Sequence, residues 1–365
     1  MSLPSPMARV LVLPKFGRLT DDIVEIVSAA DPNTLYTYVY SESSYERKLA
    51  RRPTQVLRSL VHLLPSVSMK RLAERLIVKV RYRSNEMAVD LLEFCEGVHA
   101  DHLIIVKPAL LGPEEFARIR KRLGVQLTTI VLWDAMWRTP LVEALLPQAE
   151  AAFTTEPADV VRFPSLAELP VPRSQANSVV QCTGDERVSP AFFGCASWSL
   201  DRFLAARKFV AAASCADIGF CVHLVTDRPL LKLLNRLSGI ESDRLDVEEN
   251  RRMVGGCEVH VDFGRRGQTS PSERLTDSAI AGVLLLTQNP WLAGAGYPVV
   301  DGRKSWVSGV VAAKALIGRE TKHERANTWQ DRSDLAPYLM SGAQWFEMLT
   351  SAEKNQSVEL ELEAV

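Results

Sequence analysis

Several features that mark common protein classes are missing from this 365-residue sequence. Its six cysteines are scattered, with no C-x-x-C pair and no Cys/His cluster at metal-ligand spacing, so we expect reduced thiols and no metal site. No apolar run approaches the roughly 18 residues that cross a bilayer. The motifs G-x-G-x-x-G, G-x-x-x-x-G-K-[ST], G-x-S-x-G and H-E-x-x-H are also absent, which removes several well-known nucleotide-binding and hydrolytic classes.

Net charge is missing as well. The chain carries 43 Lys and Arg against 44 Asp and Glu, a net charge of −1, so nothing at whole-chain level indicates nucleic-acid binding.

The N-terminal residues, MSLPSPMARVLVLPKFGR, have no basic region followed by an export-length apolar segment. We therefore expect a cytoplasmic protein, touching a membrane only peripherally at its inner face.

What is present is a repeated alternation of short β-branched runs with longer helical patterns. This alternation is typical of βαβ units around a parallel sheet, so the sequence predicts an α/β fold. We expect strands at 8–13, 34–40, 102–107, 126–133, 151–154, 191–194, 219–226, 257–263 and 283–287. Amphipathic or proline-initiated patterns predict helices at 113–123, 140–147, 200–216, 229–237 and 271–281.

A proline-rich stretch without periodicity divides the two series of strands. It predicts a first domain at 1–165, a linker at 166–188, a second domain at 189–330, and a C-terminal helix with an acidic tail at 331–365. The length of the chain fits two domains of ordinary size.

The segment 41–85, inserted into the first domain, is strongly basic. It holds eleven Lys and Arg, among them Arg51, Arg52 and Arg71, against three Glu, and its leucines and valines recur at helical spacing. We expect basic amphipathic helices that rest on anionic lipid headgroups or meet a phosphorylated acceptor. A solvated helical face packed on the sheet is the alternative.

Residues 264–287, GRRGQTSPSERLTDSAIAGVLLLT, are the most informative stretch. A loop rich in Gly, Ser and Thr runs into a predicted helix, whose free N–H groups and partial positive charge suit an anion. Three arginines can add charge against a diphosphate, and Asp277, one turn after Arg274, can accept hydrogen bonds from ribose hydroxyls. An ordinary surface helix is the alternative. The residues predicted here to bind the diphosphate and the ribose are Arg265, Arg266, Gly267, Gln268, Thr269, Ser270, Arg274 and Asp277.

The motif from Asp277 through Gly282 to an apolar strand is similar to the nucleotide-sugar signature of GT-B glycosyltransferases. More specifically, the chain resembles the CgeB-like glycosyltransferases and those of lipopolysaccharide-core and capsule biosynthesis. Four ordered segments between residues 101 and 289 carry the resemblance: HLIIVKP at 102–108, TIVLWDA at 129–135 with 145–159, FFGC at 192–195 with DRF at 201–203, and 267–282.

This resemblance implies two Rossmann-like domains facing across a cleft, with the nucleotide-sugar donor held by the second domain and the acceptor by the first. Arg274 matches the family's arginine near the donor phosphates, while Asp277 stands where the family usually has glutamate. The family's loop usually carries His-Pro before the glycine, and here Arg265 and Arg266 occupy that stretch.

Residues outside the loop complete the predicted site. Trp133 and Asp134 match the family's Trp-Asp at a strand end, where the carboxylate can deprotonate or hydrogen-bond an acceptor hydroxyl. A strand-end aspartate that caps a turn is the alternative. His260, just before the loop, is the second catalytic candidate, with a structural histidine as its alternative.

Three weaker candidates remain. Gly194, which ends a predicted strand and leaves room for a ligand or a neighbouring backbone, and Arg202, on the following helix, are donor-binding candidates. Lys107, which ends a strand of the first domain, is a candidate on the acceptor side. An exposed helical arginine and a solvent-facing lysine are the alternatives for the last two.

We therefore expect a hexosyltransferase-type enzyme that moves a sugar from a nucleotide-sugar donor to a glycan, lipid-linked or other hydroxyl acceptor. The expected pathway is bacterial envelope polysaccharide or glycoconjugate biosynthesis. A helix N-terminus and arginines can stabilise the leaving diphosphate, so no cofactor and no metal ion is expected. The alternatives are a catalytically silent scaffold with this fold and a GT-B-like epimerase or pyruvyl transferase.

Overall fold

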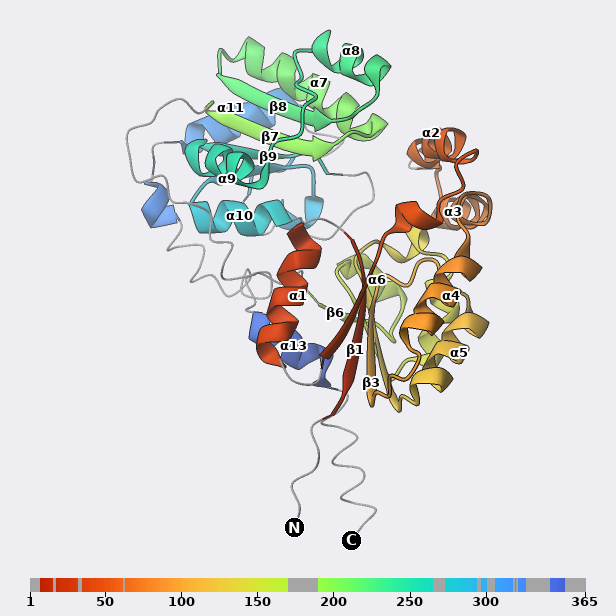
Figure 1. The fold of residues 1–365 in the computed structure, drawn as a ribbon. Coiled ribbons are helices and arrows are strands. Elements are labelled where there is room, and N and C mark those ends of the chain that lie inside the picture. Colours follow the sequence, from red (N-terminus) through yellow and green to blue (C-terminus); the bar gives the residue numbers. More distant parts are fainter. Residues whose placement is uncertain are drawn as a thin grey trace. The chain divides into compact units, whose positions relative to one another are not determined.

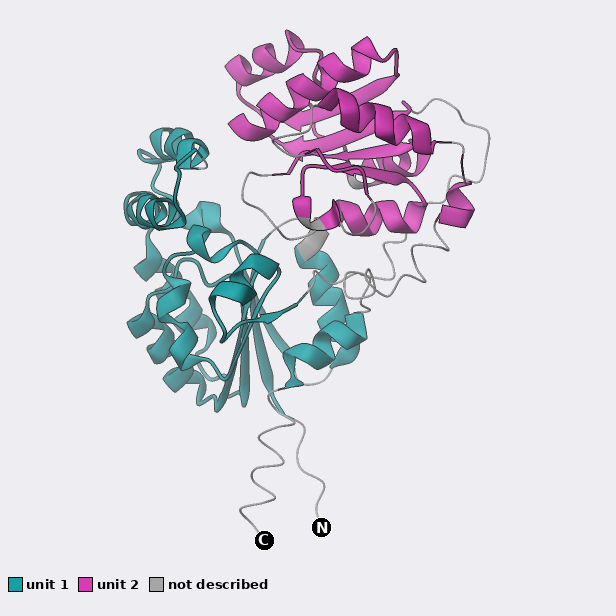
Figure 2. Cartoon of the chain, turned by 180° about the vertical axis from the view of Figure 1, so that it is seen from behind, with its two compact units in different colours: residues 1–174, 340–365 teal, residues 175–339 magenta. Residues whose placement is uncertain are grey.

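The computed structural model of the protein describes residues 7–15, 18–31, 35–61, 63–169, 190–264, 273–293, 297–300, 306–317, 319, 321–325 and 342–351. The chain forms two compact units (Figure 2): Met1–Ser174 with Met340–Val365, and Gln175–Leu339. None of the helices in these described ranges is both long and apolar enough to span a bilayer.

Unit 1 is built on a six-stranded parallel sheet of order β2-β1-β3-β4-β5-β6. The strands are β1 (Arg9–Pro14), β2 (Leu35–Tyr40), β3 (His102–Val106), β4 (Leu127–Leu132), β5 (Ala151–Thr154) and β6 (Ala167–Glu168). Strands β3 and β4 are buried along their whole length, as expected of parallel strands covered on both faces.

Helices cover both faces of this sheet (Figure 1). On one face, α1 (Arg18–Ala30) and α13 (Gly342–Leu349) pack on Leu11 and Leu13 of β1. On the other face, α4 (Ser84–Phe94) and α5 (Pro113–Leu123) pack on Val10 and Val12, because successive side chains of a strand point to opposite faces. The C-terminal helix α13 thus completes the core of the first unit.

The helix α5 follows its expected signals closely. Gly112 is its N-cap, Pro113 occupies the first turn, and Gly124 ends it with a φ of 72°, a backbone conformation that favours glycine. The remaining helices of unit 1 are α2 (Arg51–Val61), α3 (Val67–Arg81) and α6 (Pro157–Arg162).

Unit 2 contains a four-stranded parallel sheet of order β10-β9-β7-β8. Its strands are β7 (Phe192–Ser197), β8 (Phe220–Val225), β9 (Val259–Asp262) and β10 (Leu284–Thr287). Among its described residues, the helices include α7 (Leu200–Cys215), α8 (Pro229–Arg236), α9 (Val247–Gly256), α10 (Glu273–Ala281) and α11 (Trp306–Leu316).

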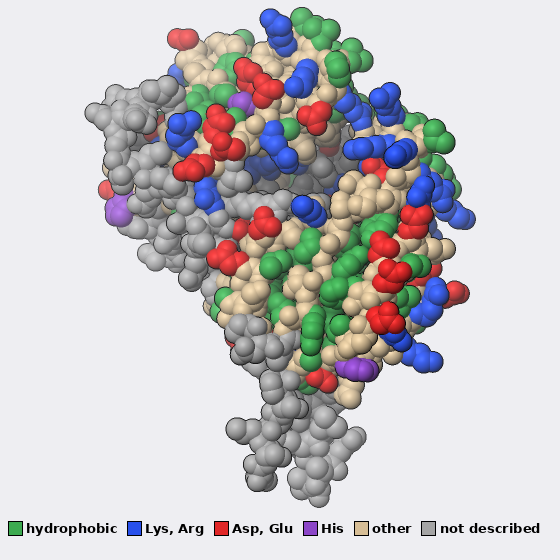
Figure 3. Space-filling model, in the orientation of Figure 1, with side chains coloured by type: hydrophobic (Ala, Val, Ile, Leu, Met, Phe, Trp, Pro, Cys, Tyr) green, Lys and Arg blue, Asp and Glu red, His purple; other side chains and the backbone are tan. Residues whose placement is uncertain are grey.

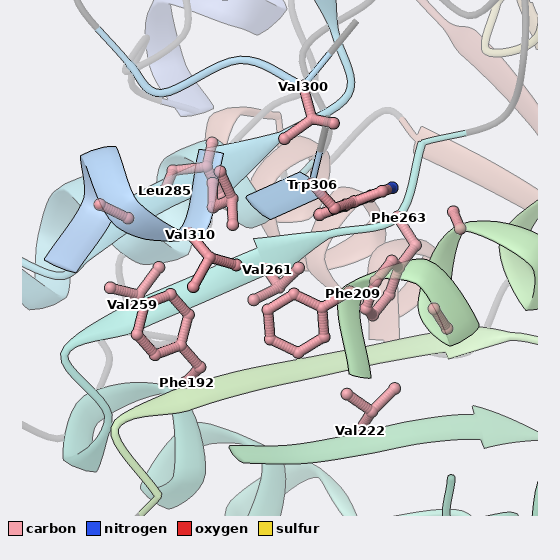
Figure 4. Close-up of a cluster of buried hydrophobic side chains, with 14 of the residues drawn as sticks. Phe192, Phe209, Val222, Val259, Val261, Phe263, Leu285, Val300, Trp306 and Val310 are labelled. Carbon is pink, nitrogen blue, oxygen red and sulfur yellow. The ribbon is translucent and has the colours of Figure 1, made fainter. Parts of the chain in front are cut away.

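The larger core of unit 2 combines aliphatic side chains with a group of packed aromatic rings (Figure 4). The ring of Phe209 on α7 packs edge-on against Phe263 and against Trp306 of α11, with centroids 5.9 and 5.8 Å apart. On the opposite face of the sheet, Val254 of α9 and Ile280 of α10 cover Phe193. Both units are therefore parallel sheets with helices on both faces, and the predicted α/β class of two Rossmann-like domains is confirmed.

Most predicted elements are found close to their expected positions, but some boundaries were wrong. Residues 140–147 form two short 3-10 turns (Val142–Ala144 and Leu146–Gln148) in place of an α-helix, since Val142 and Leu145 are drawn into the core. The strand predicted at 191–194 continues to Ser197. Residues 170–189, most of the predicted linker, lie outside the described residues.

Candidate functional site

The carboxyl edge of the unit 2 sheet has the topology of a ligand site. The chain leaves β7 for β8 on one side, whereas β9 and β10 lie on the other side of β7. Connections therefore diverge between the carboxyl ends of β7 and β9, which is where open α/β sheets bind their ligands.

Arg274 of α10 joins these two strand ends. Its Nε and Nη2 donate hydrogen bonds of 3.1 and 2.7 Å to the carbonyl of Cys195 in β7, and its Nη1 pairs at 3.1 Å with Asp262, the last residue of β9. Thr287 of β10 donates to the other oxygen of Asp262 at 3.0 Å. A guanidinium has five N–H groups, so after these three bonds it retains donors for an anion at this edge.

Arg202 of α7 makes a second link across the same strand ends. It is buried, and it donates to the carbonyl of Phe263 at 2.9 Å and to the hydroxyl of Ser197 at 2.7 Å. The alternative of an exposed helical arginine is therefore wrong. Ser199 begins α7 as its N-cap and accepts the backbone N–H of Arg202, which fixes where this arginine leaves the helix.

Asp262 is a functional candidate that the sequence analysis missed. Its side chain is buried at the sheet edge and receives both Arg274 and Thr287. The available signal was an acidic residue near the carboxyl end of an apolar strand, but the strand predicted at 257–263 placed Asp262 inside it.

The other predicted residues of unit 2 are placed as follows. Asp277 lies half-buried on α10, one turn after Arg274. Gly194 lies inside β7, where a Cβ would approach the Phe263 ring to 2.6 Å, so packing alone requires glycine. The loop residues Arg265, Arg266, Gly267, Gln268, Thr269 and Ser270 lie outside the described residues.

His260 lies within the buried interior of unit 2. Its Nδ1 is 3.0 Å from the hydroxyl of Ser278, and its ring stacks on Phe193. Burial, reinforced by the charge of Arg274, lowers the pKa of His260 to about 3, so the imidazole is neutral at physiological pH. These contacts favour the structural alternative for this histidine.

A second polar cluster lies at the carboxyl edge of the unit 1 sheet. Lys107, directly after β3, is buried, and its Nζ lies 2.9 Å from Glu42 and 3.1 Å from Asp134. Arg138 binds the other oxygen of Asp134. Both oxygens of the predicted catalytic carboxylate are therefore engaged by cations, and the solvent-facing alternative for Lys107 is wrong.

The backbone at Lys107 has a φ of 52°, in the left-handed region that non-glycine residues rarely adopt. The hydroxyl of Tyr40 holds this turn by donating to the Lys107 carbonyl at 2.6 Å. Strained backbone of this kind is concentrated at functional sites, where the surroundings enforce it. Glu42, which follows β2, and Arg138 complete the cluster and were not predicted.

The other residues predicted for unit 1 lie outside this polar cluster. Trp133 packs against the core between the sheet, α1 and α13. Arg71 pairs with Glu143 at 2.9 Å and covers the Phe163 ring, so it ties α3 to the domain. Arg51 and Arg52 are exposed on α2, and Arg51 pairs with Glu46 at 3.2 Å.

A buried ion pair extends from this cluster into the α2–α3 hairpin (residues 51–81). Glu74 of α3 is fully buried and pairs at 3.3 Å with Arg58 of α2, which also reaches the hydroxyl of Tyr82. Burial raises the pKa of Glu74 against the opposing charge of Arg58. Within the described ranges, no three His, Cys, Asp or Glu side chains gather in a metal-binding arrangement.

Comparison by sequence finds no relative, since no protein-family model and no curated protein matches the chain. Comparison by structure finds many. A glycosyltransferase from Rickettsia africae has a TM-score of 0.56 at 8% identity, with 96% of this chain and 100% of that chain covered. Phytolacca americana UGT2, solved with UDP-2-fluoro-glucose and pterostilbene, has a TM-score of 0.52 at 10% identity, covering 96% and 100%.

A UDP-N-acetylglucosamine 2-epimerase is similar to the same extent, with a TM-score of 0.52, 11% identity and 97% of each chain covered. At such identities these similarities concern the fold alone. They agree with the two parallel sheets in assigning the GT-B fold to this chain.

Proposed function

We propose that this protein is a glycosyltransferase that moves a sugar from a nucleotide-diphosphate sugar to an acceptor hydroxyl. The observation that carries the proposal is the pair of arginines, Arg202 and Arg274, fixed across the β7 and β9 ends of a Rossmann-like unit. The GT-B fold and the resemblance between residues 101 and 289 support it.

In this proposal the diphosphate binds at the carboxyl edge of unit 2. Arg274 donates its remaining N–H groups to the phosphates, while Asp262 and the Cys195 carbonyl hold the guanidinium in position. Asp277 binds the ribose, and the sequence adds Arg265, Arg266, Gly267, Gln268, Thr269 and Ser270 as candidate phosphate ligands. Positive charge fixed in advance stabilises the leaving nucleoside diphosphate, so the transfer needs no metal ion.

The acceptor binds in unit 1, where Asp134 is the catalytic candidate. Its carboxylate lies between Lys107 and Arg138, so it can take the acceptor proton only as one of these cations moves to another partner. Lys107 already pairs with Glu42, so it keeps a partner when it leaves Asp134. Lys107 is then a positioning residue for Asp134.

We further propose a place in bacterial envelope polysaccharide or glycoconjugate synthesis, in the cytoplasm at the inner face of the membrane. The resemblance to the lipopolysaccharide-core and capsule family supports this assignment. A GT-B-like sugar epimerase is the second candidate, because an epimerase shares the fold to the same extent as the transferases.

The proposal is tested by incubating the full chain with UDP-, GDP- and CMP-linked sugars and a set of glycan and lipid-linked acceptors. Released nucleoside diphosphate and the product mass are measured, with and without a chelator. Transfer without metal is the expected result. A sugar nucleotide of unchanged mass but altered stereochemistry would indicate the epimerase, and complete loss of transfer with chelator would contradict the metal-free route.

The matched variants are R274Q and R236Q. Arg274 lies at the sheet edge, whereas Arg236 is exposed on α8 of the same unit. Loss of one charged hydrogen-bonding group to the diphosphate lowers kcat/KM by about 10- to 100-fold. R236Q is expected to retain full activity, and equal losses in both variants would contradict the proposed donor site.

A further inference from the structure

The α2–α3 hairpin turns its apolar side chains outward. Leu72 and Leu76 of α3 are 60% and 59% exposed, and Val80 continues their row at helical spacing. On α2, Val56, Leu57 and Leu60 are exposed in the same way. The two helices contact each other, so both rows are carried by one helical pair.

The inner side of the hairpin mixes polar and apolar side chains and leaves most of its leucines outside. Arg58, Glu74 and Tyr82 form the buried network described above, while Val78 joins the unit 1 core and Val61 and Ile77 pack against Ala135 and Trp137. The exposed leucines are thus not needed for packing within unit 1. Exposing them costs solvation free energy unless another surface covers them.

The charges of the hairpin identify the chemistry of that surface. All three glutamates of residues 41–85 are paired: Glu42 with Lys107, Glu46 with Arg51 and Arg81, and Glu74 with Arg58. Arg52 and Lys79 lie exposed beside the apolar rows, with Arg47 and Lys48 just before α2. Figure 3 shows hydrophobic and basic side chains together where α2 and α3 lie.

We propose that the α2–α3 hairpin is a docking surface for an anionic lipid bilayer. Its leucines enter the boundary between headgroups and acyl chains, while the exposed cations bind the headgroup phosphates. The exposed rows hold no acidic side chain and lie beside Arg52 and Lys79, which is the pattern of a helix that lies on anionic lipid. The proposal goes beyond the sugar transfer and does not depend on it, because docking is measured without turnover.

The test uses sedimentation of the full chain with vesicles of phosphatidylcholine alone and of phosphatidylcholine with 30% phosphatidylglycerol. Each cation close to an anionic surface contributes about fivefold to binding. We therefore expect at least tenfold tighter binding to the anionic vesicles, and a fall in binding as salt rises from 0.05 to 0.5 M, because salt screens these charges.

Two hairpin variants and one control separate the contributions of the apolar side chains and of the cations to vesicle binding. L72E/L76E and R52E/K79E each lose at least tenfold in binding, whereas L230E/L233E, on the exposed leucines of α8, loses less than either. Since all these side chains are exposed, unchanged circular dichroism shows that the fold is intact. L60W adds a reporter whose emission shifts to the blue on binding.

Each contrary outcome overturns the proposal. These outcomes are no binding, equal binding to neutral and anionic vesicles, retained binding by the hairpin variants, or equal losses in the α8 control. A dimer in light scattering that L72E/L76E dissociates would assign the surface to a second copy of the chain. Failure of the glycosyltransferase assay with intact vesicle binding would leave this surface standing and contradict only the proposed reaction.

Discussion

The pH dependence of unit 2 stability should follow from His260. The folded-state pKa is about 3, against an ordinary value of 6.5, because burial and Arg274 disfavour the imidazolium. As the pH falls, the unfolded chain takes up the proton first, so stability is lost below about pH 6.5. The linkage relation gives a loss of about 2 kcal/mol between pH 7 and pH 5, and of about 4 kcal/mol by pH 3.

The variant H260N removes the titrating ring but keeps a polar atom near Ser278, the hydrogen-bond partner of the imidazole. Its stability should be lower at pH 7 by a constant amount, and the difference from wild type should shrink by about 2 kcal/mol from pH 7 to pH 5. Urea unfolding at pH 5, 6 and 7, with hydrogen exchange of the β9 amides to isolate unit 2, measures this difference.

S278A is the control, because it removes the hydroxyl and leaves the histidine in place. Its stability should fall with pH as steeply as that of the wild type. If wild type and H260N lose stability in parallel between pH 7 and pH 5, His260 titrates near its ordinary value. The assignment of a neutral, structural imidazole would then be refuted.

Three further stability changes follow from single side chains. G282A should lower the free energy of unfolding by at least about 2 kcal/mol, because φ is 62° at this position and a Cβ would lie 1.8 Å from the Lys322 carbonyl oxygen. An unchanged Tm in thermal unfolding would contradict this. Burial raises the pKa of Asp159 to about 6, so the folded state takes up this proton first as the pH falls. The free energy of unfolding of the wild type should therefore rise by about 1 kcal/mol from pH 7 to pH 5, and D159N should lack this rise. Urea midpoints of the two proteins that change in parallel across this range would disprove the prediction. K107M should lower the free energy of unfolding by about 3 kcal/mol in urea, since it leaves Glu42 and Asp134 without the cation that they share. A loss below about 1 kcal/mol would mean that these ion pairs contribute little to stability.

The sequence predicted the strands because a parallel strand buried on both faces needs an unbroken apolar run, as in HLIIV of β3. It failed at residues 140–147, where apolar spacing and prolines also fit a helix. There the burial of Val142 and Leu145 against the sheet sets the chain into 3-10 turns, a tertiary effect that local propensity does not contain.

The candidate sites were predictable only in part. Arg274 stood out because it follows a Gly- and Ser-rich loop at the start of a helix, and Asp134 because it follows a predicted strand; both lie in a resembling motif. Glu42 became visible only in the structure, because the parallel sheet brings it to Lys107 from a distant part of the chain. The amphipathic pattern of α2 and α3 was equally clear in the sequence, but periodicity alone does not say whether the apolar or the polar side faces the domain.

The central claim is that the carboxyl edge of unit 2 binds a nucleoside diphosphate through Arg274. Calorimetric titration of UDP, GDP and the corresponding sugar nucleotides into the full chain, without metal ions, tests this claim most directly. The account predicts saturable binding of at least one ligand to the wild type and R236Q, weakened about 10- to 100-fold in R274Q. Absence of binding for every ligand, or equal affinity for the wild type and R274Q, would contradict it.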